Sequence, residues 1–175
     1  MKRWVGHNRY IVRPGPWRPK VVALKGIVLY DTGYGNTQQI AEAIADALKE
    51  RGHEVGLHHI RDAGKIGPAD YDFVVIGSPT KMGTMSFAMR RFLGKFKGEG
   101  WKGKPFFAFD TELVDNIEKG EASAGEKIQK ELEERGMKPL VTVLKVGVAG
   151  MKGPLVSGAV EMAKEHALDF ASSLG

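Results

Sequence analysis

The sequence predicts a three-layer α/β fold in which a five-stranded parallel sheet of order 2-1-3-4-5 carries helices on both faces. The chain has 175 residues, of which 42% are hydrophobic and 27% are charged, a size and composition typical of one globular domain. Short β-branched runs alternate with stretches of helical period, which indicates a parallel sheet between helices. Right-handed crossovers leave few arrangements of five such strands, and the doubly wound order is the leading one.

The first part of this alternation predicts three strands and one helix. Residues 21–31 form an apolar run, and residues 36–51 follow it with an amphipathic helical pattern. Residues 53–60 alternate weakly between apolar and polar side chains, as in a second strand. The continuous apolar run 72–77 is typical of a strand that is buried on both faces of a parallel sheet.

The second part predicts two more strands and three helices. Residues 86–96 carry an apolar stripe at helical spacing, and residues 104–110 form the fourth strand. A charged helix is expected over residues 123–135, and a fifth strand over residues 140–148. Residues 155–174 close the chain as a helix. In this topology, a ligand binds at the carboxyl ends of the first and third strands.

Composition excludes several classes of site. The chain contains no cysteine, so it forms no disulfide and supplies no thiolate for catalysis, zinc or an iron–sulfur cluster. We expect a cytoplasmic protein, since such a chain suits a reducing compartment. No apolar stretch reaches the roughly 18–20 residues of a membrane helix. The start also lacks the apolar core of a signal peptide, and we therefore expect no membrane span.

The net charge of +5 is concentrated at the N-terminus. Residues 1–25 hold seven basic and no acidic residues, which leaves 19 basic against 21 acidic residues in the remainder. Three prolines prevent a continuous helix in residues 1–20. We therefore predict an extended basic arm over residues 1–20 and a domain over residues 21–175.

The composition of this arm is compatible with a polyanion, because tryptophan and tyrosine alternate with arginine and lysine. We favour other interpretations over nucleic acid. The arm packs on the domain or on a second copy of the chain, as in a homo-oligomer, or the start codon is assigned too far upstream.

A polar turn connects the first predicted strand to the first helix. Its two glycines allow a tight turn, and its hydroxyl and amide side chains add donors at the positive end of the helix dipole. Such a cup suits a phosphate that is bound by dipoles, since the turn contains no lysine or arginine. It is neither a Walker loop nor the dinucleotide fingerprint. The turn consists of Thr32, Gly33, Tyr34, Gly35, Asn36 and Thr37.

The segment 28–37, followed by Ala41 and Ile44, resembles the phosphate-loop signature of the flavodoxin family. A second turn, residues 77–80, follows the third predicted strand and resembles the flavodoxin loop beside the isoalloxazine ring. The resemblance extends over residues 22–174 and implies a flavodoxin-like fold with FMN as cofactor.

The resemblance also implies which residues surround the FMN. The turn 32–37 would bind its phosphate. The flavin ring would lie between the loop after the third strand and the loop after the fourth. These two loops contribute Ser78, Pro79, Thr80, Lys81, Met82 and Gly83 from the first, and Asp110 and Thr111 from the second. No catalytic side chain and no metal ligand is expected.

The expected flavin site departs from the family in its aromatic cover. Flavodoxins usually place aromatic residues on both sides of the ring, whereas neither loop contains one at the expected positions. Met82 stacks on the flavin or packs in the core, and Tyr34 shields the cofactor or points to solvent. The body of the chain also lacks the strong acidity of its relatives, which weakens the expectation that it docks onto a basic partner.

Three functions are compatible with these features. The preferred one is an FMN-binding electron-transfer protein that passes electrons between redox partner proteins. The alternative is a flavodoxin-fold enzyme, such as an NAD(P)H:quinone reductase or a relative of menaquinone-dependent protoporphyrinogen oxidase, which residues 83–92 resemble. Its substrate would be NAD(P)H or a small quinone-like molecule. The third is a binding module that has lost its flavin and acts through the arm.

Other signals are interpreted structurally. A response-regulator receiver needs an aspartate at the end of the third strand, where this chain has Gly77 and Ser78. His58 and His59 face opposite sides of a predicted strand and make a poor metal pair. The glycine-rich segment 147–153 is interpreted as a turn, with contact to a ligand as the weaker alternative, and Trp101 as a packing anchor.

Overall fold

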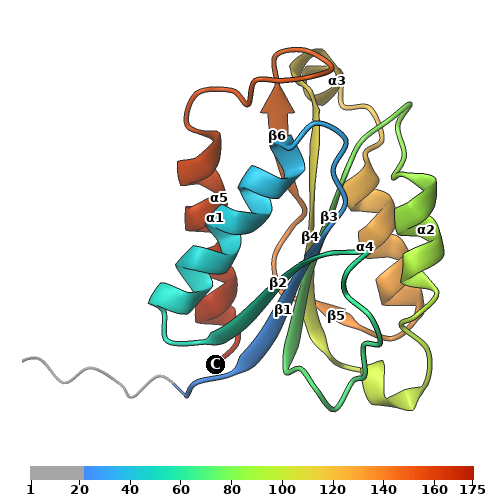
Figure 1. Cartoon of the computed structure of the whole chain (residues 1–175), viewed down its shortest axis with the longest axis vertical. Coiled ribbons are helices and arrows are strands. Elements are labelled where there is room, and N and C mark those ends of the chain that lie inside the picture. Colours follow the sequence, from blue (N-terminus) through green and yellow to red (C-terminus); the bar gives the residue numbers. More distant parts are fainter. Residues whose placement is uncertain (1–21) are drawn as a thin grey trace, which may run out of the picture.

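The computed structural model describes residues 22–175 and confirms the predicted sheet. All its strand pairs are parallel. The fifth position is shared by two short strands, one beside the start of the fourth strand and one beside its end. In spatial order the strands are β2 (Glu54–His59), β1 (Lys25–Tyr30), β3 (Phe73–Pro79), β4 (Pro105–Leu113), and then β5 (Lys138–Pro139) with β6 (Leu144–Val148) (Figure 1).

The split fifth strand corrects the prediction of one strand over residues 140–148. β5 pairs with Pro105 and Phe106, and β6 rejoins β4 only at Phe109. Pro139 has no N–H to donate to a ladder. The chain therefore leaves β4 after a single further hydrogen bond, from the Leu140 N–H to the Phe106 carbonyl at 3.3 Å.

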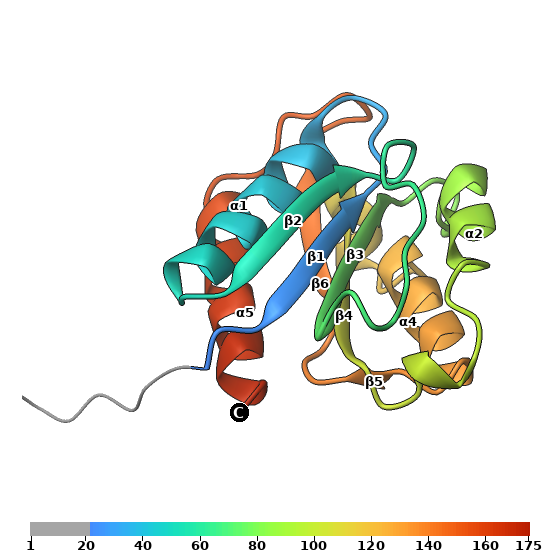
Figure 2. The same ribbon diagram turned by 60° about the horizontal axis from the view of Figure 1, so that its bottom comes forward.

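Helices cover both faces of the sheet, as predicted. The longer pair, α1 (Asn36–Glu50) and α5 (Ala159–Ser173), lies on one face, and α2 (Phe87–Leu93) and α4 (Ala124–Glu134) lie on the other (Figures 1 and 2). Successive side chains of the central strands enter opposite cores, which explains why these strands are continuously apolar in sequence.

Aromatic rings fill both cores. On the α1/α5 face the ring of Phe170 lies edge to face with Phe107, and their centroids are 4.9 Å apart. On the other face Trp101 is 1% exposed and packs on Phe96 with centroids 4.8 Å apart, so its prediction as a packing anchor is confirmed. Gly77 makes room for another ring, since a Cβ there would lie 2.4 Å from the ring of Phe109.

Two short helices were not predicted, namely η1 (Glu99–Trp101) and α3 (Val114–Glu118). The second of these follows β4 at the carboxyl edge of the sheet (Figure 1). The predicted arm, residues 1–20, lies outside the described residues. In the part of the chain that the structure describes, no helix is both long and apolar enough to cross a bilayer.

Candidate functional site

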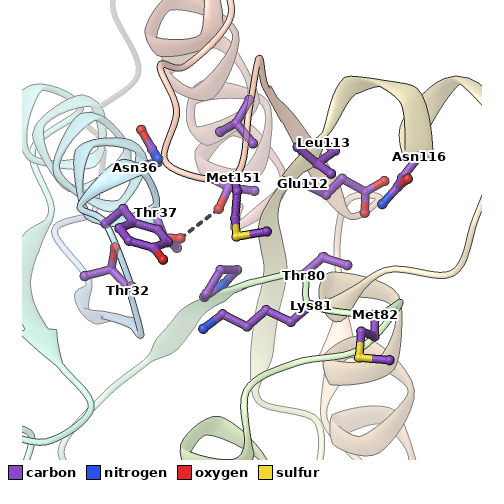
Figure 3. A pocket seen from close by; sticks show the side chains of 15 residues that line it. Thr32, Asn36, Thr37, Thr80, Lys81, Met82, Glu112, Leu113, Asn116 and Met151 are labelled. Carbon is purple, nitrogen blue, oxygen red and sulfur yellow. Dashed lines mark hydrogen bonds between the residues drawn. The ribbon is translucent and has the colours of Figure 1, made fainter.

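A cavity of about 380 Å³ opens where the carboxyl ends of β1, β3 and β4 meet α1 and α3 (Figure 3). Its size lies within the roughly 300–1,000 Å³ of small-molecule sites. Ten of the fourteen residues predicted to surround a cofactor line it. They are Thr32, Gly33, Tyr34, Asn36, Thr37, Pro79, Thr80, Lys81, Met82 and Thr111.

The turn before α1 presents unpaired donors to this cavity. Gly35 precedes the helix at φ 88°, a left-handed conformation that favours glycine, and no side chain caps the helix. The Thr32 hydroxyl oxygen accepts the Gly35 N–H at 2.9 Å, which closes the turn. The N–H groups of Asn36 and Thr37 find no acceptor within residues 22–175. They are among the first N–H groups of the helix, which lack intrahelical partners and carry the positive end of its dipole, so an anion is stabilised here.

A buried hydrogen bond fixes this turn to the opposite wall. The hydroxyl groups of Thr37 and Thr111 lie 2.8 Å apart and join the start of α1 to β4 (Figure 3). Both side chains are buried. The bond sets the spacing between two of the three strand ends that form the cavity.

The fold brings two lysines to a turn that has no cation of its own. Lys81 Nζ lies 3.7 Å from the point where a Cβ on Gly33 would sit, and its side chain extends toward Thr32 in Figure 3. Lys152 Nζ lies 5.9 Å from the centroid of the Tyr34 ring. An anion at this turn would therefore meet positive side chains as well as backbone dipoles. The sequence of the turn, which has no lysine or arginine, had predicted binding by dipoles alone.

Four predicted residues do not line the cavity. Gly35 shapes the turn, and Gly83 adopts φ 72° after the exposed Met82. The hydroxyl of Ser78 donates to the Pro79 carbonyl at 3.1 Å. Asp110 is fully buried in β4. These four residues lie behind the cavity walls, and the positions that line the cavity belong to their neighbours.

A polar cluster around Asp31 connects the turn 32–37 to the sheet. Asp31 is 7% exposed, and its Oδ1 lies 3.3 Å from His59 Nε2. The same oxygen accepts the Thr32 N–H at 3.0 Å, while the Ser86 hydroxyl donates to Oδ2. Asp31 therefore links β1 to β2 and to the start of α2, directly beneath the turn.

Five lining residues were not predicted. β4 continues to Leu113, three residues past the predicted end of that strand, and α3 follows at once. The segment 147–153 turns after the end of β6, as predicted, and its Val148 and Met151 line the cavity. The additional residues are Glu112, Leu113, Asn116, Val148 and Met151.

The cavity has little aromatic cover among its described residues. Tyr34 is the aromatic side chain on its lining, and it is 52% exposed. Met82 is fully exposed, with a positive φ of 51°, which excludes the prediction that it packs in the core. Both residues lie on the rim.

Two buried carboxyl groups stand side by side on β4. Asp110 and Glu112 are 0% and 2% exposed, and residues two apart on a strand point to the same face. Burial and the nearby Asp110 raise the pKa of Glu112 to about 7. Burial also raises the pKa of Asp110 to about 6, against the opposing effect of hydrogen bonds from the Ser123 side chain and the Gly125 N–H. Glu112 is the residue of this pair that lines the cavity.

No metal site accompanies these acids. Within residues 22–175, no group of three or more histidine, aspartate or glutamate side chains is arranged to hold a metal ion. His58 and His59 belong to no such group.

The fold and the cavity define a doubly wound α/β protein with a donor-rich turn at the switch point of its sheet. A sequence profile described as a flavodoxin domain matches residues 27–149, most of the chain. The chain belongs to this flavodoxin-domain family, as the resemblance of its first loop indicated.

Two curated relatives each match less than half of the chain. The chain is 40% identical over 78 residues to a flavodoxin of Aquifex aeolicus, and this match covers 44% of the chain and 42% of the relative. It is 32% identical over 94 residues to "NAD(P)H dehydrogenase (quinone) 3" of Rhizobium meliloti, with 42% and 44% covered. The matched part thus spans less than half the length of either relative.

Solved structures share the fold. Oxidised Flavodoxin 1 from Bacillus cereus superposes with a TM-score of 0.71 at 20% identity, over 85% of this chain and 97% of that one. Flavodoxin 2 from the same organism gives 0.70 at 24% identity, with 85% and 98% covered. At this identity the likeness establishes the flavodoxin-like fold.

Proposed function

We propose that this protein binds FMN and transfers electrons between redox partner proteins. One observation carries the proposal: the unpaired N–H groups that begin α1 open onto a cavity of about 380 Å³ together with Lys81. FMN combines a phosphate with an extended ring. A donor-rich anion site at one end of a largely apolar cavity matches that combination.

The donor set fits each part of the cofactor. The turn 32–37 and Lys81 would hold the phosphate by hydrogen bonds and charge. The ring would lie between Pro79 and Met82 on one side and Leu113 on the other, with Val148 and Met151 nearby. When bound, FMN supplies one- and two-electron chemistry. The chain binds and orients it, and its apolar side chains exclude water.

Titration of FMN into the ligand-free protein tests this proposal. We expect saturable quenching of flavin fluorescence at a 1:1 ratio. A Thr32→Val variant should bind more weakly, since the Gly35 N–H loses its acceptor in the turn. Lack of binding by a folded wild-type protein would refute the proposal.

A second candidate is a flavodoxin-fold oxidoreductase that acts on a quinone-like substrate or on protoporphyrinogen. The match to an NAD(P)H dehydrogenase (quinone) supports it, as does the scarcity of aromatic side chains around the cavity, which leaves room for a substrate beside the ring. Steady-state oxidation of NAD(P)H by a small quinone distinguishes the two functions. Rapid turnover favours the enzyme, whereas reduction in two separate one-electron steps without such turnover favours the carrier.

A further inference from the structure

Glu112 is a buried acid on the cavity wall without hydrogen-bond partners. It is 2% exposed, and neither of its carboxyl oxygens bonds to any described residue. Figure 3 places it with Asn116 and Leu113 on the side of the cavity opposite Thr32 and Asn36. A buried polar group without a partner is costly. Glu112 lines the cavity, but its two oxygens are buried in this structure, so the carboxyl group must turn toward the cavity to meet a ligand there.

The charges around Glu112 disfavour its ionised form. Asp110 stands beside it on β4, and Glu126 of α4 also contributes negative charge. Lys145 of β6 is the opposing cation, but its Nζ lies 3.0 Å from Glu126 Oε1. The α3 residue at the cavity, Asn116, carries no charge. Among residues 22–175, three carboxyl groups thus share one cation that already has a partner.

The two neighbouring acids differ in how well a negative charge is stabilised. Asp110 Oδ2 accepts the Gly125 N–H at 2.9 Å, at the positive start of α4. A Cβ on Gly125 would lie 2.7 Å from that oxygen, so the glycine permits the approach. Glu112 has no backbone donor of this kind among the described residues. The neighbouring Thr80 hydroxyl is its nearest donor and partly opposes the rise of its pKa. Asp110 also keeps one oxygen, Oδ1, without a partner. When the pair carries a single negative charge, these contacts favour the charge on Asp110 and the proton on Glu112.

We propose that Glu112 takes up a proton when an anionic ligand fills the cavity, and that its neutral carboxyl group donates a hydrogen bond to an acceptor atom of that ligand. The inference rests on the proposed function in taking FMN as this ligand. The step converts a carboxylate and one proton from solvent into a carboxylic acid, and no electron moves.

Proton uptake by Glu112 should make ligand affinity fall as the pH rises. In the ligand-free protein the pKa of Glu112 is about 7, so a large fraction is ionised at neutral and alkaline pH. A ligand that displaces water and adds negative charge raises this pKa further. Binding must then draw a proton from solvent, and the affinity falls by up to about tenfold for each pH unit above the pKa of the free protein.

The experiment compares FMN affinity between about pH 6 and pH 9 in the wild type, Glu112→Gln and Glu134→Gln. Glutamine mimics the neutral acid. Glu134 is an exposed glutamate of α4 and serves as the matched control. We expect the wild type and the Glu134 variant to weaken by roughly 30- to 100-fold over the alkaline range, and Glu112→Gln to stay nearly constant. Calorimetry at about pH 8 in two buffers of different ionisation enthalpy should show uptake of about one proton, which is lost in Glu112→Gln.

The outcomes separate the two proposals. If FMN binds but Glu112→Gln keeps the pH dependence and the proton uptake of the wild type, the inference is overturned and the proposed function stands. If no variant binds FMN, the proposed function is overturned, and with it the ligand on which the inference rests. A carboxyl ¹³C titration of the ligand-free protein provides an independent readout. A Glu112 resonance that titrates at the ordinary pKa overturns the inference in either case.

Discussion

Replacing Glu112 by glutamine should stabilise the folded protein at alkaline pH, even without a ligand. The change keeps the size of the side chain and removes its ability to ionise. In the wild type, unfolding exposes Glu112 to water, where its pKa returns to 4.5 from about 7. The folded state therefore binds this proton more tightly than the unfolded state does.

The sign and size of the effect follow from this difference. Between about pH 4.5 and pH 7 the folded wild type keeps a proton that the unfolded chain releases, so its free energy of unfolding falls as the pH rises through this window. A change from 4.5 to about 7 corresponds to about 3 kcal/mol, at about 1.4 kcal/mol per pKa unit. The free energy of unfolding of the glutamine variant does not fall in this way, because glutamine does not ionise. Its advantage over the wild type should be small near pH 4 and reach about 3 kcal/mol near pH 8.

Urea unfolding of both proteins across this range measures the difference directly. Comparison at equal pH cancels the titration of most other groups, and Glu134→Gln controls for the loss of a glutamate at the surface. In thermal unfolding, 3 kcal/mol corresponds to roughly 6–12 °C for a domain of this size. A difference between wild type and Glu112→Gln that does not change with pH would refute the assignment of the buried proton to Glu112.

Three further predictions concern the fold and the anion site. Gly77→Ala places a Cβ 2.4 Å from the Phe109 ring, so urea unfolding should show a loss of about 1–3 kcal/mol; an unchanged midpoint would contradict the observed packing. Gly35→Ala forces alanine into a left-handed conformation, which costs about 1–2 kcal/mol. Fluorescence titration should therefore show roughly 5- to 30-fold weaker FMN binding. Equal affinity would mean that the turn does not hold the phosphate. Lys81→Gln should weaken FMN binding mainly at an ionic strength of about 0.01 M and little at about 1 M, where charges are screened. The exposed Lys130→Gln on α4 is its control, and an equal loss at both salt concentrations would exclude a role for the Lys81 charge.

The parts of the site that could be predicted are those encoded by neighbouring residues. The turn 32–37 lies between a strand and a helix whose patterns are both clear, and its glycine and threonine residues serve the local chain path. The loop at Pro79 follows β3 in the same way. The parallel order of the sheet fixes the proximity of these strand ends, so local patterns and topology together were sufficient.

The wall around Glu112 depends on contacts between distant segments. A buried strand is expected to be apolar, so the polar residues after Phe109 indicated that the strand ends at Asp110. Instead, β6 pairs with β4 as far as Leu113 and places Glu112 opposite Gly147. The five-residue α3 has no side-chain cap that would mark its start. Neither feature leaves a local signal in the sequence.

The same dependence on distant contacts explains the charge of the site. The turn 32–37 lacks cations, and the net charge of the chain comes from its first 25 residues, yet folding places Lys81 beside Gly33 and Lys152 beside Tyr34.

The opposite side of the cavity carries Glu112, whose neighbours favour its neutral form. A ligand thus meets positive charge and N–H donors at one end and, once Glu112 has taken up its proton, a neutral acid at the other. On the proposed function, this polarity favours a molecule with an anionic group at one end and a hydrogen-bond acceptor at the other. An ionised Glu112 would repel an anionic ligand from its end of the cavity, so the proposed proton uptake and the proposed phosphate site would act together.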